Sequence, residues 1–138
     1  MKKIILAVFL IGILSENIFS QPTGWQHVMP VAVTENSGST LVNYQLHLTI
    51  NTQALIANLQ MNSNGDDIRF KGNCLGTNLN YWIESGINTA STSIWVEIDT
   101  LPANSTKTIF MFYGNPSALA ATTLSTFNGP NSATDSVN

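Results

Sequence analysis

The sequence predicts an all-β protein, an antiparallel β-sandwich of the jelly-roll-like or Ig-like type, preceded by a signal peptide. Three observations lead to this fold class. After residue 20, short runs of alternating apolar and polar residues recur, turn signals rich in Asn, Gly and Pro separate them, and little helical periodicity lies between them. Short strands at this spacing pack as two antiparallel sheets.

The first 20 residues have the order of a secretory signal peptide. Lys2 and Lys3 precede the apolar run Ile4–Leu14, and a more polar stretch ends at Ser20. This run is too short for a membrane-spanning helix, which needs about 20 residues. We expect cleavage between Ser20 and Gln21, and secretion to the cell envelope or exterior without membrane insertion. An uncleaved anchor is the alternative.

The first strands expected after the signal peptide are Val28–Thr34 and Tyr44–Ile50. The second alternates strictly, with its even-numbered residues apolar, as a half-buried strand requires. Asn51 and Thr52 are suited to cap a short helical turn that reaches Leu59.

Four further strands are expected at 68–71, 79–84, 93–99 and 108–113. The last is apolar on both faces, which predicts a central place in its sheet, and 101–106 is the turn before it. Asn115-Pro116 ends this strand. Residues 117–138 are rich in Ser, Ala, Thr and Asn, which predicts a linker or the start of a truncated downstream region. The folded module is therefore placed at 21–116.

Composition excludes one class of partner. After residue 20 the chain has three cations and seven acids, and therefore a formal net charge of −4. Three scattered cations cannot neutralise a run of phosphates, so no nucleic acid is expected as a partner.

Cys74 is the only cysteine, so no internal disulfide can form, and we interpret it as a small buried residue.

Catalytic and metal-binding patterns are weak. His27 and His47 stand outside any nucleophile motif and are interpreted as surface residues. Glu84 and Glu97 each follow a Trp by two residues, and a glycoside hydrolase needs two carboxylates, but the sequence does not give their separation. Hydrolysis is the least favoured function, and we expect no enzymatic activity and no cofactor.

The segment 62–66 has oxygen-bearing side chains at alternate positions, as calcium loops do. Asn62, Asn64 and Asp66 carry them, but the twelve-residue frame and its final Glu are missing. An ordinary Asn/Gly turn is favoured, and no metal site is expected.

Two tryptophans are candidate ligand-binding residues. Trp95 lies on the face of its strand opposite the aliphatic residues. If the aliphatic face forms the core, Trp95 is exposed or lies under a loop. Trp82 is the second candidate. Exposed aromatic faces bind the C–H-rich faces of sugars. The alternative is that Trp95 covers a second core layer.

Arg69 is predicted to be a structural residue paired with Glu84 or, failing that, with Asp67.

Several segments together resemble one family. They include Asp67-Ile68-Arg69-Phe70, Tyr81-Trp82-Ile83-Glu84 and Tyr113-Gly114-Asn115-Pro116. From about Trp25 to Pro116, the chain is similar to the domain of unknown function 2341 of exported bacterial proteins. That family usually places Arg where Val28 stands here.

The resemblance implies a module of larger secreted or surface proteins, often beside lectin-like or adhesion domains. We expect a non-catalytic accessory module that displays neighbouring domains or weakly binds extracellular carbohydrate. The alternative is a purely structural spacer domain without a ligand.

Overall fold

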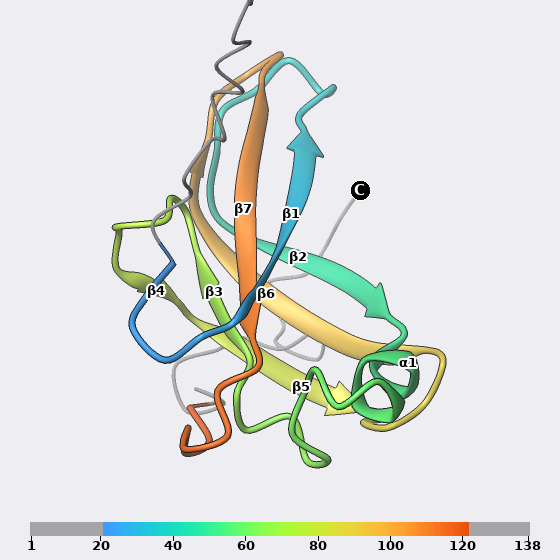
Figure 1. Cartoon of the computed structure of the whole chain (residues 1–138). Coiled ribbons are helices and arrows are strands. Elements are labelled where there is room, and N and C mark those ends of the chain that lie inside the picture. Colours follow the sequence, from blue (N-terminus) through green and yellow to red (C-terminus); the bar gives the residue numbers. More distant parts are fainter. Residues whose placement is uncertain (1–20, 122–138) are drawn as a thin grey trace, which may run out of the picture.

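The computed structural model describes residues 21–121, which form two antiparallel sheets packed against each other (Figure 1). The predicted all-β sandwich is confirmed. The predicted signal peptide at 1–20, and residues 122–138 of the predicted linker, lie outside the described residues.

Four strands form the first sheet. In sheet order they are β1 (His27–Thr34), β7 (Thr106–Tyr113), β3 (Arg69–Lys71) and β4 (Asn78–Leu79). The predicted central place of β7 is confirmed, because it pairs with β1 on one side and β3 on the other. Its two apolar faces explain this place: Met111 is fully buried in the core between the sheets, and Phe112 is also fully buried although it lies outside that core cluster.

Three strands form the second sheet. In sheet order they are β2 (Leu41–Ile50), β6 (Thr92–Leu101) and β5 (Tyr81–Ser85). The central strand β6 buries Ile94, Val96 and Ile98 completely, so Trp95 lies on the outer face, as the alternation predicts. Tyr44 differs from the expectation of a buried even-numbered face, because it is 41% exposed on the edge strand β2.

The strand predicted at 79–84 is divided between the two sheets. Leu79 pairs with Phe70 of β3 in the first sheet, whereas Tyr81 pairs with Val96 of β6 in the second. The chain passes between the sheets at Asn80, whose backbone carbonyl accepts the N–H of Glu97 at 2.9 Å. Tyr81 is buried in the core, and its hydroxyl donates to the Ile68 carbonyl at 2.8 Å.

One short helix, α1 (Thr52–Ala57), follows β2. The predicted cap is confirmed at Asn51, whose side chain accepts the backbone N–H of Ala54 at 3.0 Å. The helix ends before Leu59, which has a positive φ of 58° and is 94% exposed. Within residues 21–121, no helix is long and apolar enough to cross a membrane.

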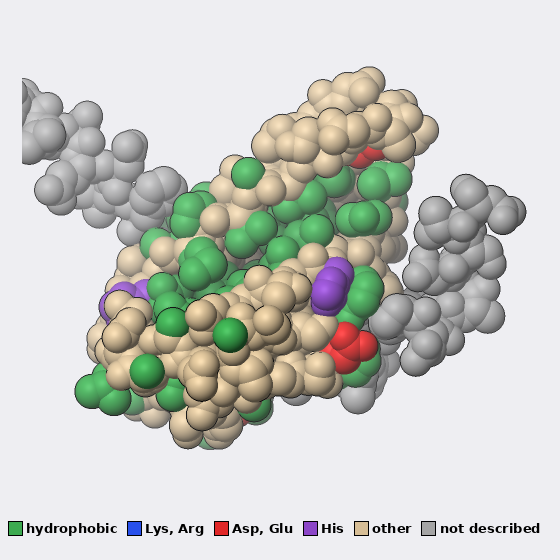
Figure 2. Space-filling view, turned by 90° about the vertical axis from the view of Figure 1, so that its right-hand side faces the viewer, with side chains coloured by type: hydrophobic (Ala, Val, Ile, Leu, Met, Phe, Trp, Pro, Cys, Tyr) green, Lys and Arg blue, Asp and Glu red, His purple; other side chains and the backbone are tan. Residues whose placement is uncertain are grey.

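The sandwich is open along the flank formed by the edge strands β1 and β2 and by α1. Figure 2 shows hydrophobic side chains gathered at the centre of this flank. The half-buried hydrophobic residues of β1, β2 and α1 that pack against the core are Met29, Val31, Leu41, Leu46, Leu48, Leu55 and Ile56. The exposure of Tyr44 follows from the same open edge.

Candidate functional site

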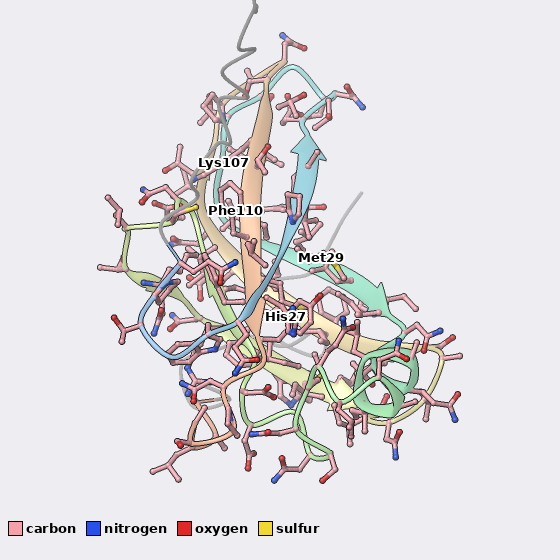
Figure 3. The ribbon with its side chains drawn as sticks, in the orientation of Figure 1. His27, Met29, Lys107 and Phe110 are labelled. Atoms are coloured by element: carbon pink, nitrogen blue, oxygen red, sulfur yellow. The ribbon has the colours of Figure 1, made fainter. Side chains whose placement is uncertain are left out.

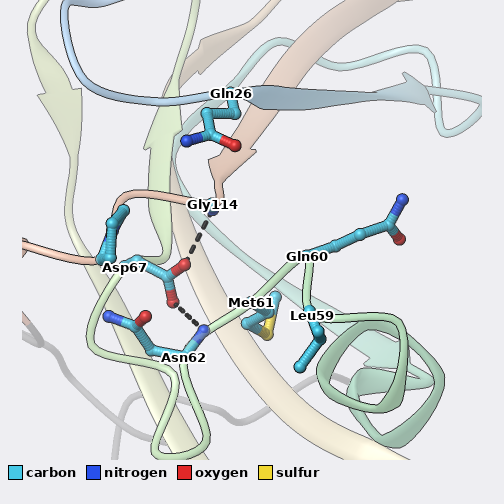
Figure 4. A pocket seen from close by; sticks show the side chains of 8 residues that line it. Gln26, Leu59, Gln60, Met61, Asn62, Asp67 and Gly114 are labelled. Atoms are coloured by element: carbon cyan, nitrogen blue, oxygen red, sulfur yellow. Dashed lines mark hydrogen bonds between the residues drawn. The ribbon is translucent and has the colours of Figure 1, made fainter.

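Asp67 occupies a fully buried position where three segments meet. One carboxylate oxygen accepts the backbone N–H of Asn62 at 3.0 Å and the other accepts that of Gly114 at 2.7 Å (Figure 4). Its backbone carbonyl accepts the indole N–H of Trp25 at 2.9 Å. A cavity of about 120 Å³ adjoins it. Because both oxygens bind backbone donors, Asp67 holds the fold together and is not a free acid in this cavity.

The predicted ion pair of Arg69 is wrong. Arg69 lies on β3 in the first sheet and Glu84 on β5 in the second, so the two side chains do not meet. Asp67 is occupied by backbone donors instead. The Arg69 guanidinium donates to three carbonyls, those of Asp66 at 2.9 Å, Ile68 at 2.5 Å and Leu119 at 2.6 Å. The sequence places both residues in strands but does not tell which sheet each strand joins.

The two candidate tryptophans are brought together on the outer face of the three-stranded sheet. Trp82 of β5 is the register partner of Trp95 of β6, and Trp95 is in turn the partner of His47 of β2. Register partners share a face, so the three rings form a row across all three strands. We call these three residues the aromatic row. Both tryptophans are half-buried and His47 is exposed.

From the sequence His47 was interpreted as a surface residue and not as a ligand-binding candidate, because only strand pairing shows what lies beside it. Its ring centroid lies 4.7 Å from that of Trp95, with the planes tilted by 37°. Its Nε2 lies 2.7 Å from the Ser93 hydroxyl oxygen.

A chain of hydrogen bonds borders the aromatic row. The Ser93 hydroxyl donates to Glu84 Oε2 at 2.6 Å, and the Trp95 indole N–H donates to the same oxygen at 3.2 Å. Ser93 has one hydroxyl hydrogen, so His47 Nε2 is the donor in its contact with Ser93. The bonds from Ser93 and then Trp95 lower the pKa of Glu84. This network fixes the orientation of both the Trp95 and the His47 rings.

The other acid considered for hydrolysis lies on the same outer face. Glu97 follows Trp95 by two residues on β6 and accepts a bond from the Asn80 side chain at 3.5 Å. General acids in glycoside hydrolysis have a raised pKa, whereas that of Glu84 is lowered.

The remaining sequence candidates are placed as follows. His27 stacks on Tyr113 with ring centroids 5.2 Å apart, at the start of β1 (Figure 3). Cys74 is half-buried in the loop between β3 and β4 rather than fully buried. In the segment 62–66, the Asn64 amide donates to Asp66 Oδ2 at 2.5 Å. Among the described residues, no group of His, Cys, Asp and Glu is arranged to hold a metal ion.

A second carboxylate joins the loop that follows β1 to the loop between β6 and β7, at one tip of the sandwich. Glu35, 3% exposed, accepts backbone N–H groups from Ser37 at 2.5 Å, Gly38 at 3.1 Å and Asn104 at 2.8 Å. The pKa of Glu35 is lowered, first by the hydrogen bond from the Ser37 side chain and then by the bond from the Asn104 backbone. This role of Glu35 was not predicted, and an acid two residues before a Ser-Gly turn is the sequence signal that would have suggested it.

Comparison with known proteins identifies one family. The family model described as "Domain of unknown function (DUF2341)" matches residues 64–136, just over half of the chain. The match continues past Pro116, where the sequence predicts that the folded module ends. No curated protein and no solved structure matches the chain.

Proposed function

Because this chain belongs to the DUF2341 family, whose description assigns no activity, we propose a function from its own surface: a non-catalytic accessory module of an exported protein that binds neutral carbohydrate weakly. The observation that carries the proposal is the aromatic row of His47, Trp95 and Trp82 across the outer face of the second sheet. Aromatic rings on an open face provide a platform for the C–H faces of pyranose rings.

The surroundings of the row support a sugar ligand. The Trp95 indole is held by Glu84, so little ring freedom is lost when a ligand stacks on it. The same face has Glu84, Ser93 and Glu97, whose oxygen atoms can accept hydrogen bonds from sugar hydroxyl groups. Lysines and arginines are absent from β2, β5 and β6, which favours a neutral glycan over an acidic one.

Binding to a soluble neutral β-glucan tests this function. Retardation of the protein in a native gel that contains the glucan measures its affinity. Trp95→Ala and Trp82→Ala should each lower this affinity at least about tenfold, equivalent to ~1.4 kcal/mol. Tyr44→Ala is the control. Tyr44 is an exposed aromatic residue on β2, but it pairs with the buried Ile98 and so belongs to the other face. Unchanged retardation in both tryptophan variants would reject the aromatic row as a binding site.

Export is the second part of the proposal, and it is supported by the charged, apolar and polar order of residues 1–20. Intact-mass analysis of the protein from the periplasm or medium should give a chain that begins at Gln21. Recovery of the full-length chain in the cytoplasm alone would contradict export.

A structural role beside another domain is the second candidate. The open apolar flank of β1, β2 and α1 favours it, because half-buried hydrophobic residues on an open edge gain stability when a neighbouring domain covers them (Figure 2). Under this alternative, Leu46→Asn and Leu48→Asn would impair assembly of the parent protein but leave glucan binding unchanged.

A further inference from the structure

The positive charges of the described residues are distributed unequally over the two sheets. The described residues contain three cations, and Lys107 of β7 is neutralised by Asp99 at 2.8 Å (Figure 3). Arg69 and Lys71 have no carboxylate partner in the described part of the chain. The printed donors of Arg69 go to backbone carbonyls, its side chain also bonds the Tyr81 hydroxyl, and Lys71 donates to the Gly76 carbonyl at 2.9 Å. These neutral partners satisfy N–H groups but leave both positive charges without a counter-charge.

These two cations share one face because of the geometry of β3. They flank Phe70, which is fully buried in the core, so both side chains point to the outer side of the first sheet. The segment before β1 passes over this side and places Pro22 and Trp25 beside them. Five residues line a cavity of about 160 Å³: Pro22, Trp25, Arg69, Lys71 and Asn78. We call it the Trp25 pocket.

One wall of the Trp25 pocket is held rigidly. The indole N–H of Trp25 is bonded to the Asp67 carbonyl, and the Arg69 guanidinium carbon lies 5.4 Å from the centroid of the Trp25 ring. The pocket is thus formed by an anchored aromatic ring and a proline, with a guanidinium and an ammonium at its polar side. Lys71 uses one of its three N–H donors on Gly76 and keeps two for a ligand.

We propose that the Trp25 pocket binds the carboxylate of an acidic sugar, a uronate residue. A carboxylate supplies the negative charge that Arg69 and Lys71 lack, and charge-assisted hydrogen bonds are stronger than those to neutral groups. The apolar wall of Pro22 and Trp25 suits the C–H face of the attached ring. The cavity of about 160 Å³ has room for a carboxylate and the adjoining ring carbons.

This site is independent of the aromatic row. The Trp25 pocket lies on the first sheet and contains two cations, whereas the row lies on the second sheet, whose strands contain no lysine or arginine. The two sites therefore differ in the charge of the ligand that they favour. Failure of one leaves the other unaffected, because no residue is shared.

Titration of the exported chain with sodium glucuronate, followed by the NMR signal of the Trp25 indole N–H, tests the proposal. Glucuronate should shift this signal in a saturable way, and glucose, which lacks the carboxylate, should not. Lys71→Gln should weaken binding at least about tenfold, and Lys71→Arg should retain it. Lys107→Gln is the matched control, because it removes the same charge at a lysine outside the pocket.

Three results would overturn the proposal. The first is no shift of the Trp25 signal with glucuronate in the unmodified chain. The second is equal weakening in Lys71→Gln and Lys107→Gln, which would reduce the effect to overall charge. The third is inorganic phosphate binding as tightly as glucuronate, which would show an unselective anion site.

Discussion

The carboxylate of Asp67 accepts the backbone N–H of Gly114 at 2.7 Å, although 47 positions separate the two residues in the chain. The same side chain accepts the N–H of Asn62, and none of its surface is exposed. Asp67→Asn replaces one of the two carboxylate oxygens with an amide NH₂ group. This group is itself a donor, so it would face a backbone N–H that has lost its acceptor. We expect this change to lower the free energy of unfolding by about 3 kcal/mol, measured by urea denaturation.

The neighbouring acid provides the control for this prediction. Asp66 is half-buried, and its carboxylate accepts a side-chain bond from Asn64 within the same turn. Asp66→Asn should change the free energy of unfolding by no more than about 0.5 kcal/mol. Equal losses in the two variants would contradict the special role of Asp67.

Gly114 should not tolerate a side chain. Its φ is +84°, and a Cβ atom would lie 2.6 Å from the His27 ring and 3.0 Å from the Gln60 carbonyl oxygen. Positive φ and this crowding act together, so Gly114→Ala should cost at least about 2 kcal/mol of stability. In Gly72→Ala the nearest atom, on the flexible Lys107 side chain, is 4.0 Å away, and the melting temperature should change little. A small loss in Gly114→Ala would show that the turn relaxes easily.

Glu35 should make the stability depend on acidic pH. Its folded pKa lies below the ordinary 4.5, so its contribution to stability is present above that pH and is lost as the pH falls through the folded pKa. Glu35→Gln should therefore melt below the unmodified chain at pH 7, and the difference should narrow below about pH 4.5. Thermal unfolding at pH 7, 5 and 3 measures this, and a constant difference would contradict the assignment.

Arg69 and Glu84 should behave as independent residues. They lie on different sheets and share no partner among the described residues, so the losses in Arg69→Ala and Glu84→Ala should add in the double variant to within about 0.5 kcal/mol. The free energies of unfolding of the two single variants and the double variant provide the measurement. A double variant no less stable than either single variant would restore the ion pair.

Much of the local structure could be predicted from the sequence. Alternation determines which face of β6 is buried, because neighbouring side chains of a strand point to opposite sides: Ile94, Val96 and Ile98 are in the core and Trp95 is outside it. Two apolar faces placed β7 at the centre of its sheet, and Asn51 capped the helix. These are properties of a few neighbouring residues, so a single segment contains enough information to determine them.

Only the tertiary structure decided which strands are partners. It divided 79–84 between two sheets, separated Arg69 from Glu84, aligned His47 with Trp95, and gathered Arg69, Lys71 and Trp25 around one cavity. The physical reason is that strand pairing depends on hydrogen bonds between backbones, which are alike in every residue except proline. Register and sheet membership follow from the packing of the whole core, in which residues such as Asp67 and Gly114 meet across long stretches of chain.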